Sequence, residues 1–214
     1  MTGRQLMADM LPIKTSSLAD ATFPALSSSR ALVLRNVVLA VAGSLLLIAA
    51  AKVKVPFWPV PMTLQTFAVL ALGATYGSRL GAATVLLYIG YGVAGLPVFT
   101  NTPPAAAGPL YLLGPTGGFL LGFVVAAAIA GWAAQRGAST LRLVGGLIVA
   151  DAVLLALGCL WLALGAQVAA GVTGVGFAKA FAVGVQPFLL GEALKIALAA
   201  CFAGLSWQML ARRG

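Results

Sequence analysis

Glu192 and Lys195 are the residues of this chain best suited to chemistry in an apolar environment. They lie three positions apart in the segment QPFLLGEALK, residues 186–195, which opens the last long apolar run. Side chains at this spacing lie on one face of a helix. Charged side chains inside a membrane are costly, and they persist where they face a cavity, a partner or a ligand. We therefore expect the other helices to fold around this pair and to form a small-molecule site.

Two further polar residues are candidates for that site. Gln65 offers both donors and an acceptor, as an amide-like or ureido ligand requires, although it is equally placed to start a helix and bond its backbone. Asp151 lies alone inside another apolar run. It is either a functional residue or the partner of a polar group on a different helix, and the sequence leaves both alternatives open.

Catalysis and metal binding are not indicated. The chain has no histidine, which is the commonest general base and metal ligand. Cys159 and Cys201 lack metal-ligand spacing, and no GxxxxGK[ST] motif marks an ATP site. There is no serine–base or paired-acid constellation, which argues against an intramembrane enzyme. We expect no catalytic residue, no cofactor and no metal.

The composition indicates a polytopic α-helical membrane protein. Of 214 residues, 61% are hydrophobic and only 8% are charged, whereas soluble domains carry about 25% charged residues. The apolar runs are continuous rather than alternating, which excludes a transmembrane β-barrel. We predict a flexible cytoplasmic tail over 1–28 and a transmembrane domain over 29–214. Its six spans are expected at 31–51, 63–77, 80–96, 115–134, 141–164 and 187–210.

Three connections carry structural signals. In 52–62, Pro56, Pro59 and Pro61 forbid a helix, and the flanking aromatic residues suit either the membrane interface or a lid. The segment 97–114 is long and uncharged, as expected of a loop that packs over a site. The segment 165–185 is predicted to be a loop with a short interfacial helix.

The charge pattern predicts an orientation in the cytoplasmic membrane. The net charge of +9 would suit a nucleic-acid binder, but most basic residues flank the apolar runs. Six spans place both termini on one side, and cytoplasmic segments carry the excess of Lys and Arg. Nine basic residues fall on the side of the termini and three on the other: Arg4, Lys14, Arg30, Arg35, Arg79, Arg136, Arg142, Arg212 and Arg213 against Lys52, Lys54 and Lys179. The loops 52–62 and 97–114 and the Glu192 end of the last span are then expected to face outward together.

Three segments resemble a known family. FWPVPMTLQTFAVLALG at 57–73, GLPVFTN at 95–101 and LLGPTGGFLLGF at 112–123 look like the signature of the BioY biotin-uptake proteins. The resemblance covers roughly residues 31–210. It implies a six-helix S component that captures biotin from outside and couples to an energising module of an energy-coupling factor (ECF) transporter. That module comprises a transmembrane coupling protein and two ATPase subunits.

The resemblance also implies residue roles. The last span of the family usually carries an Asp where this chain has Glu192, while Lys195 matches. Biotin has a ureido head, a thioether ring and a carboxylate, and Lys195 is predicted to anchor the carboxylate. Small residues of the first span, Ala40 and Ser44, are expected to contact the coupling protein. The predicted substrate-binding residues are Thr63, Gln65, Phe67, Tyr88, Tyr91, Asn101, Tyr111, Gly114, Gly117, Glu192 and Lys195.

Two alternatives differ from this interpretation. One keeps the fold and changes the ligand to another vitamin. The other is a stand-alone secondary transporter, a class that often shows internal repeats and broken helices. No clear two-fold repeat is present here, and the chain is short for that class.

Overall fold

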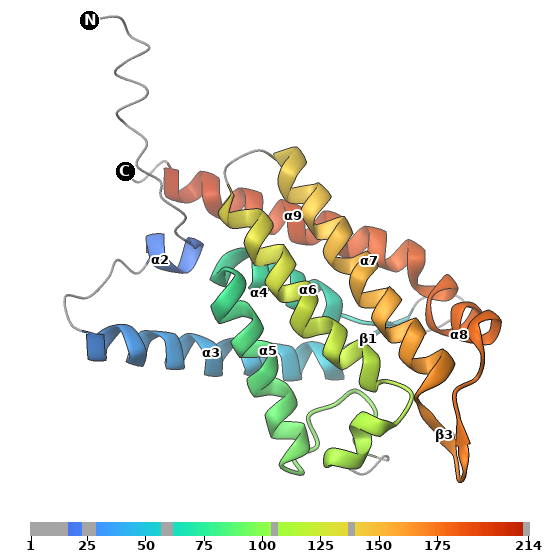
Figure 1. The fold of residues 1–214 in the computed structure, drawn as a ribbon. Helices are drawn as coiled ribbons and strands as arrows, with labels where there is room; N and C mark the ends of the chain where they lie inside the picture. Colours follow the sequence, from blue (N-terminus) through green and yellow to red (C-terminus); the bar gives the residue numbers. More distant parts are fainter. Residues whose placement is uncertain (1–16, 23–28, 57–61, 104–106, 137–139, 212–214) are drawn as a thin grey trace, which may run out of the picture.

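The computed structural model describes residues 17–22, 29–56, 62–103, 107–136 and 140–211. Within them the chain is a bundle of helices with two short strand pairs at its periphery (Figure 1). Six helices coincide with the six predicted spans: α3 (Ser29–Lys52), α4 (Gln65–Tyr76), α5 (Ser78–Val93), α6 (Gly117–Gln135), α7 (Thr140–Leu164) and α9 (Leu189–Ala211). The described chain is therefore mostly helical, in agreement with the coarse fold class predicted from the sequence.

Four helical stretches of the described chain are long and apolar enough to cross a membrane. They are Ser29–Lys52, Gly117–Gln135, Thr140–Leu164 and Phe177–Ser206. The helices α4 and α5 have 12 and 16 residues, which is about 18 Å and about 24 Å at the rise of an α-helix. A hydrocarbon core is about 30 Å thick. A multi-pass protein is thus supported, while six complete crossings are not confirmed.

The helix α6 lies at the centre of the bundle, packed against α7, α4 and α5. Glycines allow the closest of these approaches. A Cβ on Gly73 of α4 would lie 2.4 Å from the carbonyl oxygen of Ala127, and one on Gly131 of α6 would lie 2.3 Å from the backbone nitrogen of Ser78. Small residues let membrane helices gain packing contacts where no hydrophobic effect drives them together.

The helix α3 crosses the bundle on one side and packs mainly on α5 and α4 (Figure 1). Gly43 and Ser44 are buried in that contact. The rest of α3 presents apolar side chains outward, as expected for contact with lipid or another membrane protein. The exposed members are Leu32, Val33, Leu34, Val37, Val38, Val41, Leu45 and Leu46.

The connections contain more regular structure than the sequence predicted. Strands β1 (Lys54–Val55) and β2 (Met62–Thr63) pair antiparallel around the proline-rich loop. Its Phe57, Trp58, Pro59 and Pro61 lie outside the described residues, so neither the belt nor the lid interpretation is tested. In the segment predicted to be a loop, β3 (Gln167–Ala169) and β4 (Val172–Thr173) form a hairpin. The expected short helix follows it as α8 (Phe177–Gly184).

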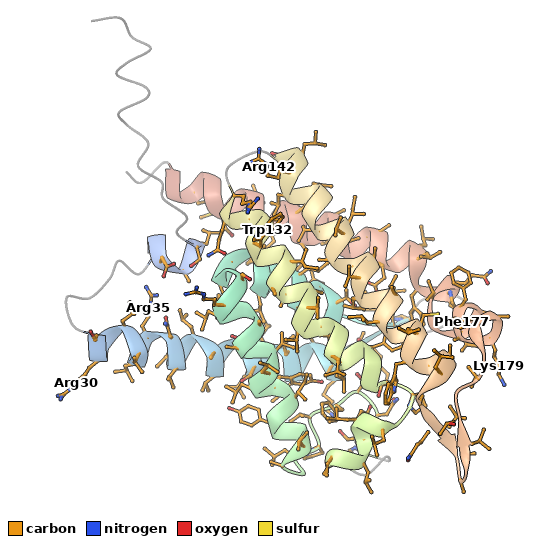
Figure 2. The ribbon with its side chains drawn as sticks, in the orientation of Figure 1. Arg30, Arg35, Trp132, Arg142, Phe177 and Lys179 are labelled. Atoms are coloured by element: carbon orange, nitrogen blue, oxygen red, sulfur yellow. The ribbon has the colours of Figure 1, made fainter. Side chains whose placement is uncertain are left out.

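Short helical turns complete the chain. The 3-10 helices η1 (Pro109–Leu113) and η2 (Gln186–Phe188) precede α6 and α9. Arg142, at the start of α7, and Lys179, on α8, lie at opposite ends of the bundle, as the predicted orientation requires of these two residues (Figure 2). The side of the membrane that each end faces stays a prediction.

The segment predicted to be a flexible tail contains one short helix, α2 (Leu18–Thr22), which packs against α4 and α9. Ser17, Leu18 and Ala19 are buried. Asp20 bonds to Ser17 and, at 2.6 Å, to Arg35 of α3. Burial alone would raise the pKa of Asp20, but these hydrogen bonds hold the pKa below its usual value. This part of the segment is therefore attached to the bundle, whereas residues 1–16 and 23–28 lie outside the described chain.

Candidate ligand-binding site

Glu192 and Lys195 form a buried ion pair in the first turns of α9. The Lys195 Nζ lies 2.8 Å from Glu192 Oε1. The residues are only 5% and 4% exposed. The hydroxyl of Thr66, at the start of α4, donates to the same Oε1 at 3.2 Å. The i,i+3 spacing thus places acid and base in contact, as predicted, and α4 supplies a third partner that the sequence did not indicate.

Asp151 joins this cluster from the middle of α7. It is 5% exposed, and its carboxyl group interacts with Glu192 and Lys195. Neither Asp151 Oδ1 nor Glu192 Oε2 receives a hydrogen bond within the described chain. Of the two alternatives that the sequence left open, Asp151 does meet polar groups of another helix, yet one of its oxygens remains unsatisfied.

A groove of about 920 Å³ runs between α7 and α9, and both acids border it. Around them its wall is apolar, with Leu155, Leu189 and Ile196. An apolar groove with a few convergent polar groups is the usual form of a small-molecule site.

Gln65 lies in a separate polar cluster on the other side of α4. Its Nε2 donates to the hydroxyl of Tyr88 at 2.9 Å, and its Oε1 accepts from Thr100 at 2.6 Å and from Thr63 at 3.3 Å. These bonds tie the start of α4 to α5 and to the segment that follows α5. The sequence left open that the Gln65 side chain bonds the backbone at the helix start. In the structure its amide group bonds other side chains instead.

Aromatic rings pack around Gln65 and its partners. Tyr88 is fully buried, and its ring meets Phe99 edge-on at 5.6 Å between centroids. Tyr111 stacks on the other side of Phe99 at 4.5 Å. Tyr91 is half-buried against the same core. Phe67, in contrast, points toward α9 and meets Phe202 edge-on at 6.5 Å.

Other predicted site residues lie outside the groove. Asn101 is exposed. The Gly114 carbonyl accepts from the indole N–H of Trp161 at 2.9 Å. A Cβ on Gly117 would lie 1.7 Å from the Leu112 carbonyl oxygen, so this backbone is in contact with the chain itself. The lining residues of the groove include Glu192 but neither Gln65 nor Asn101. Glu192 and Gln65, which were expected at one site, therefore lie in two separate clusters.

Lys52 is a functional candidate that sequence reasoning used only for orientation. Its Nζ donates to the carbonyl oxygen of Phe99 at 2.6 Å and also to that of Thr102. The end of α3 is therefore fastened to the same segment that supplies Thr100 to Gln65. A lysine directly after an apolar run carries no signal for such a contact, because its partners are backbone groups about fifty positions away.

The two residues predicted to contact a coupling protein are placed differently. Ser44 is fully buried among the helices of its own chain, and its hydroxyl donates to the Val41 carbonyl oxygen at 2.8 Å. Ala40, one turn earlier, is half-buried. In this arrangement Ser44 is not accessible to another protein, whereas Ala40 lies beside the outward apolar face of α3.

Comparisons with known proteins identify relatives along most of the chain. Residues 19–212 match the model of the BioY family. A probable biotin transporter BioY of Pyrococcus horikoshii is 35% identical over 72% of this chain and 84% of its own length. The biotin transporter BioY of Thermotoga maritima is 32% identical over 74% of this chain and 87% of its own length.

A solved structure has a similar fold. The S-component for biotin from an ECF-type ABC transporter aligns with 87% of this chain and 94% of its own, with a TM-score of 0.58 and 15% sequence identity. At this identity the likeness concerns the fold alone.

Proposed function

The chain belongs to the BioY family, and on that premise we propose that it binds biotin and takes it up across the cytoplasmic membrane as the substrate-specific component of an ECF-type transporter. The observation that carries the site assignment is the buried ion pair between Lys195 and Glu192, whose carboxyl group lines the α7–α9 groove. The cost of burying these charges is offset where a polar ligand group meets them.

The charge balance favours the ureido head of biotin at this pair. The ammonium of Lys195 already meets Glu192, and Asp151 lies beside them. A ligand carboxylate would bring a further negative charge to two acids. The ureido head instead offers an N–H donor to Glu192 and a carbonyl oxygen to the remaining N–H groups of Lys195. We therefore assign the ureido head to Glu192 and Lys195, in place of the carboxylate that the sequence suggested.

The Gln65 cluster has a supporting role in this proposal. Its side-chain oxygen and one of its N–H groups are engaged by Thr100, Thr63 and Tyr88. These bonds hold the segment after α5 against the start of α4, next to Thr66. Direct ligand contacts remain predictions for Thr63, Gln65, Phe67, Tyr88, Tyr91, Asn101, Tyr111, Gly114 and Gly117.

Energisation is proposed to come from partners. The family resemblance supplies the expectation of a transmembrane coupling protein and two ATPase subunits, with both termini of this chain in the cytoplasm. The outward apolar face of α3 supports a contact there, since it carries eight exposed aliphatic side chains on a helix of which little is buried. We propose that α3 contacts the coupling protein through the surface around Ala40.

Uptake of radiolabelled biotin tests ligand and energisation together. Cells lacking their own biotin transporters would express this chain alone or with the coupling protein and ATPases. We expect saturable uptake that unlabelled biotin abolishes and that thiamine or riboflavin leaves unchanged. Uptake that responds to another vitamin instead of biotin would contradict the ligand, and full uptake with an ATPase unable to hydrolyse ATP would contradict the energising module.

A further inference from the structure

Asp151 is a buried acid in the middle of a membrane-crossing helix to which the proposed function gives no task. It is 5% exposed, and its Oδ1 receives no donor within the described chain. A buried acceptor without a partner costs free energy in proportion to its desolvation, and the cost is greater for a charged group. Asp151 therefore needs either a compensating neighbour or a ligand.

The neighbours of Asp151 compensate it only in part, through its interactions with Glu192 and Lys195. The charged groups around it are Glu192 and Lys195 on α9, and from α4 the only polar contribution described is the hydroxyl of Thr66. Lys195 and Thr66 both donate to Glu192 Oε1. Two acids share one base, so Glu192 Oε2 and Asp151 Oδ1 are left as acceptors.

The two free acceptors come from different helices but border one groove. Both Asp151 and Glu192 line the space of about 920 Å³ between α7 and α9, where the surrounding wall is aliphatic. Asp151 Oδ1 and Glu192 Oε2 receive no hydrogen bond within the described chain. They match a ligand group that presents two N–H donors and carries no negative charge. A cyclic urea has this pattern, whereas a carboxylate or a thioether has no N–H to give.

We propose that Asp151 is a second ligand-reading residue, which together with Glu192 receives the two ureido N–H groups of biotin. The inference rests on the proposed biotin-binding function. Asp151 and Glu192 then hold the ureido ring between α7 and α9, and the ligand satisfies the two acceptors that the chain leaves open. Asp151 selects ligands by their N–H donors rather than by their apolar rings.

Equilibrium binding to the purified full chain tests this role. The variant Asp151→Asn keeps the size of the side chain and removes its charge. Loss of a charge-assisted hydrogen bond should weaken biotin binding about tenfold to a hundredfold. The matched control is Cys159→Ser, eight positions further along α7 and not among the residues that line the groove, which should bind biotin as the wild type does. Asp151→Ser, measured in parallel, allows the same comparison if Asp151→Asn does not fold.

Modified ligands separate a direct contact from a structural one. Biotin methylated at one or the other ureido nitrogen competes with radiolabelled biotin for the wild type and for Asp151→Asn. For one of the two isomers the wild type and Asp151→Asn should have about the same affinity, because that isomer lacks the N–H that Asp151 receives. An unchanged difference for both isomers would overturn the direct contact, and so would a variant that binds biotin like the wild type.

Biotin binding by the wild-type chain distinguishes failure of the role of Asp151 from failure of the proposed function. If the wild-type chain binds biotin and Asp151→Asn binds it equally well, the inference fails and the proposed function stands. If the wild-type chain binds no biotin in the same titration, both are overturned.

Discussion

At the scale of single residues, the site depends on how two donors are distributed over the carboxylate of Glu192. Glu192 Oε1 accepts from both Lys195 and Thr66, and this fixes the direction in which Oε2 is free. Thr66 thereby joins α4 to α9 at Glu192, which lines the groove. A side chain that only orients Glu192 should matter less for binding than one that contacts the ligand.

Removing the Thr66 hydroxyl tests that orienting role. The variant Thr66→Val keeps the side-chain shape but takes one donor from Glu192, so biotin affinity should fall about threefold to tenfold in a titration. The control is Thr84→Val, because Thr84 is equally buried and its hydroxyl bonds only the Leu80 carbonyl of its own helix. Equal losses for the two variants would argue for a general effect on packing.

The sequence predicts contacts between residues that are close in the chain and fails for those that are far apart. The Glu192–Lys195 pair follows from helical spacing alone. The bond from Thr66 to Glu192 joins residues 126 positions apart, and no periodicity in the sequence reports which helices will be neighbours. For the same reason the sequence did not indicate that Asp151, on α7, interacts with Glu192 and Lys195 of α9.

At the scale of elements, α3 is connected to the segment after α5 by Lys52 and to α5 by the buried Gly43–Ser44 contact. The lysine holds the carbonyl oxygens of Phe99 and Thr102. Phe99 in turn lies between Tyr88 and Tyr111, and Thr100 bonds Gln65. A displacement of the end of α3 would therefore be transmitted to the cluster around Gln65.

The variant Lys52→Met should loosen this segment. It keeps an unbranched side chain of similar length but leaves the two carbonyl groups without their cation. Amide hydrogen exchange over residues 97–103 should become faster, while exchange in the core of α6 should not change. Lys54→Met is the control, since Lys54 is exposed and lies two positions away. Exchange rates unaffected by Lys52→Met would show that the aromatic packing alone holds the segment.

Element positions were predictable because each apolar run is continuous and is separated from the next by Pro, Gly or basic residues. The lengths of α4 and α5 were harder to predict, because hydropathy alone does not report where a helix meets the membrane boundary. The hairpin of β3 and β4 was missed because its strands are only three and two residues long and carry no alternating pattern. The loop residues were expected at one site, yet Asn101 is exposed and Gln65 bonds internally.

At the scale of the whole molecule, the chain has a groove between α7 and α9 and an apolar outward face on α3. The helices α7 and α9 lie on a different side of the bundle from α3 (Figure 1). The proposal gives them different tasks: the groove binds the ligand, and α3 contacts the coupling protein. The two tasks should therefore be separable by mutation.

Ala40→Trp tests that separation. A bulky ring beside the outward face of α3 should leave biotin binding to the purified chain unchanged and should reduce uptake by cells that also carry the coupling protein and ATPases. Leu160→Trp is the control, because Leu160 is exposed on α7, whereas α3 packs mainly on α5 and α4. Normal uptake by Ala40→Trp would remove this part of α3 from the interface.

The most direct measurement is equilibrium binding of radiolabelled biotin to the purified wild type and to Lys195→Met. Lys195 is buried, donates to Glu192 and is the described cation nearest the groove acids. We predict saturable binding by the wild type and a loss of about tenfold or more in the variant, with a similar loss for biotin amide because the carboxylate is not the group bound. The double variant Glu192→Gln with Lys195→Met controls for an unpaired buried acid. A Lys195→Met chain that binds biotin as tightly as the wild type would contradict the account.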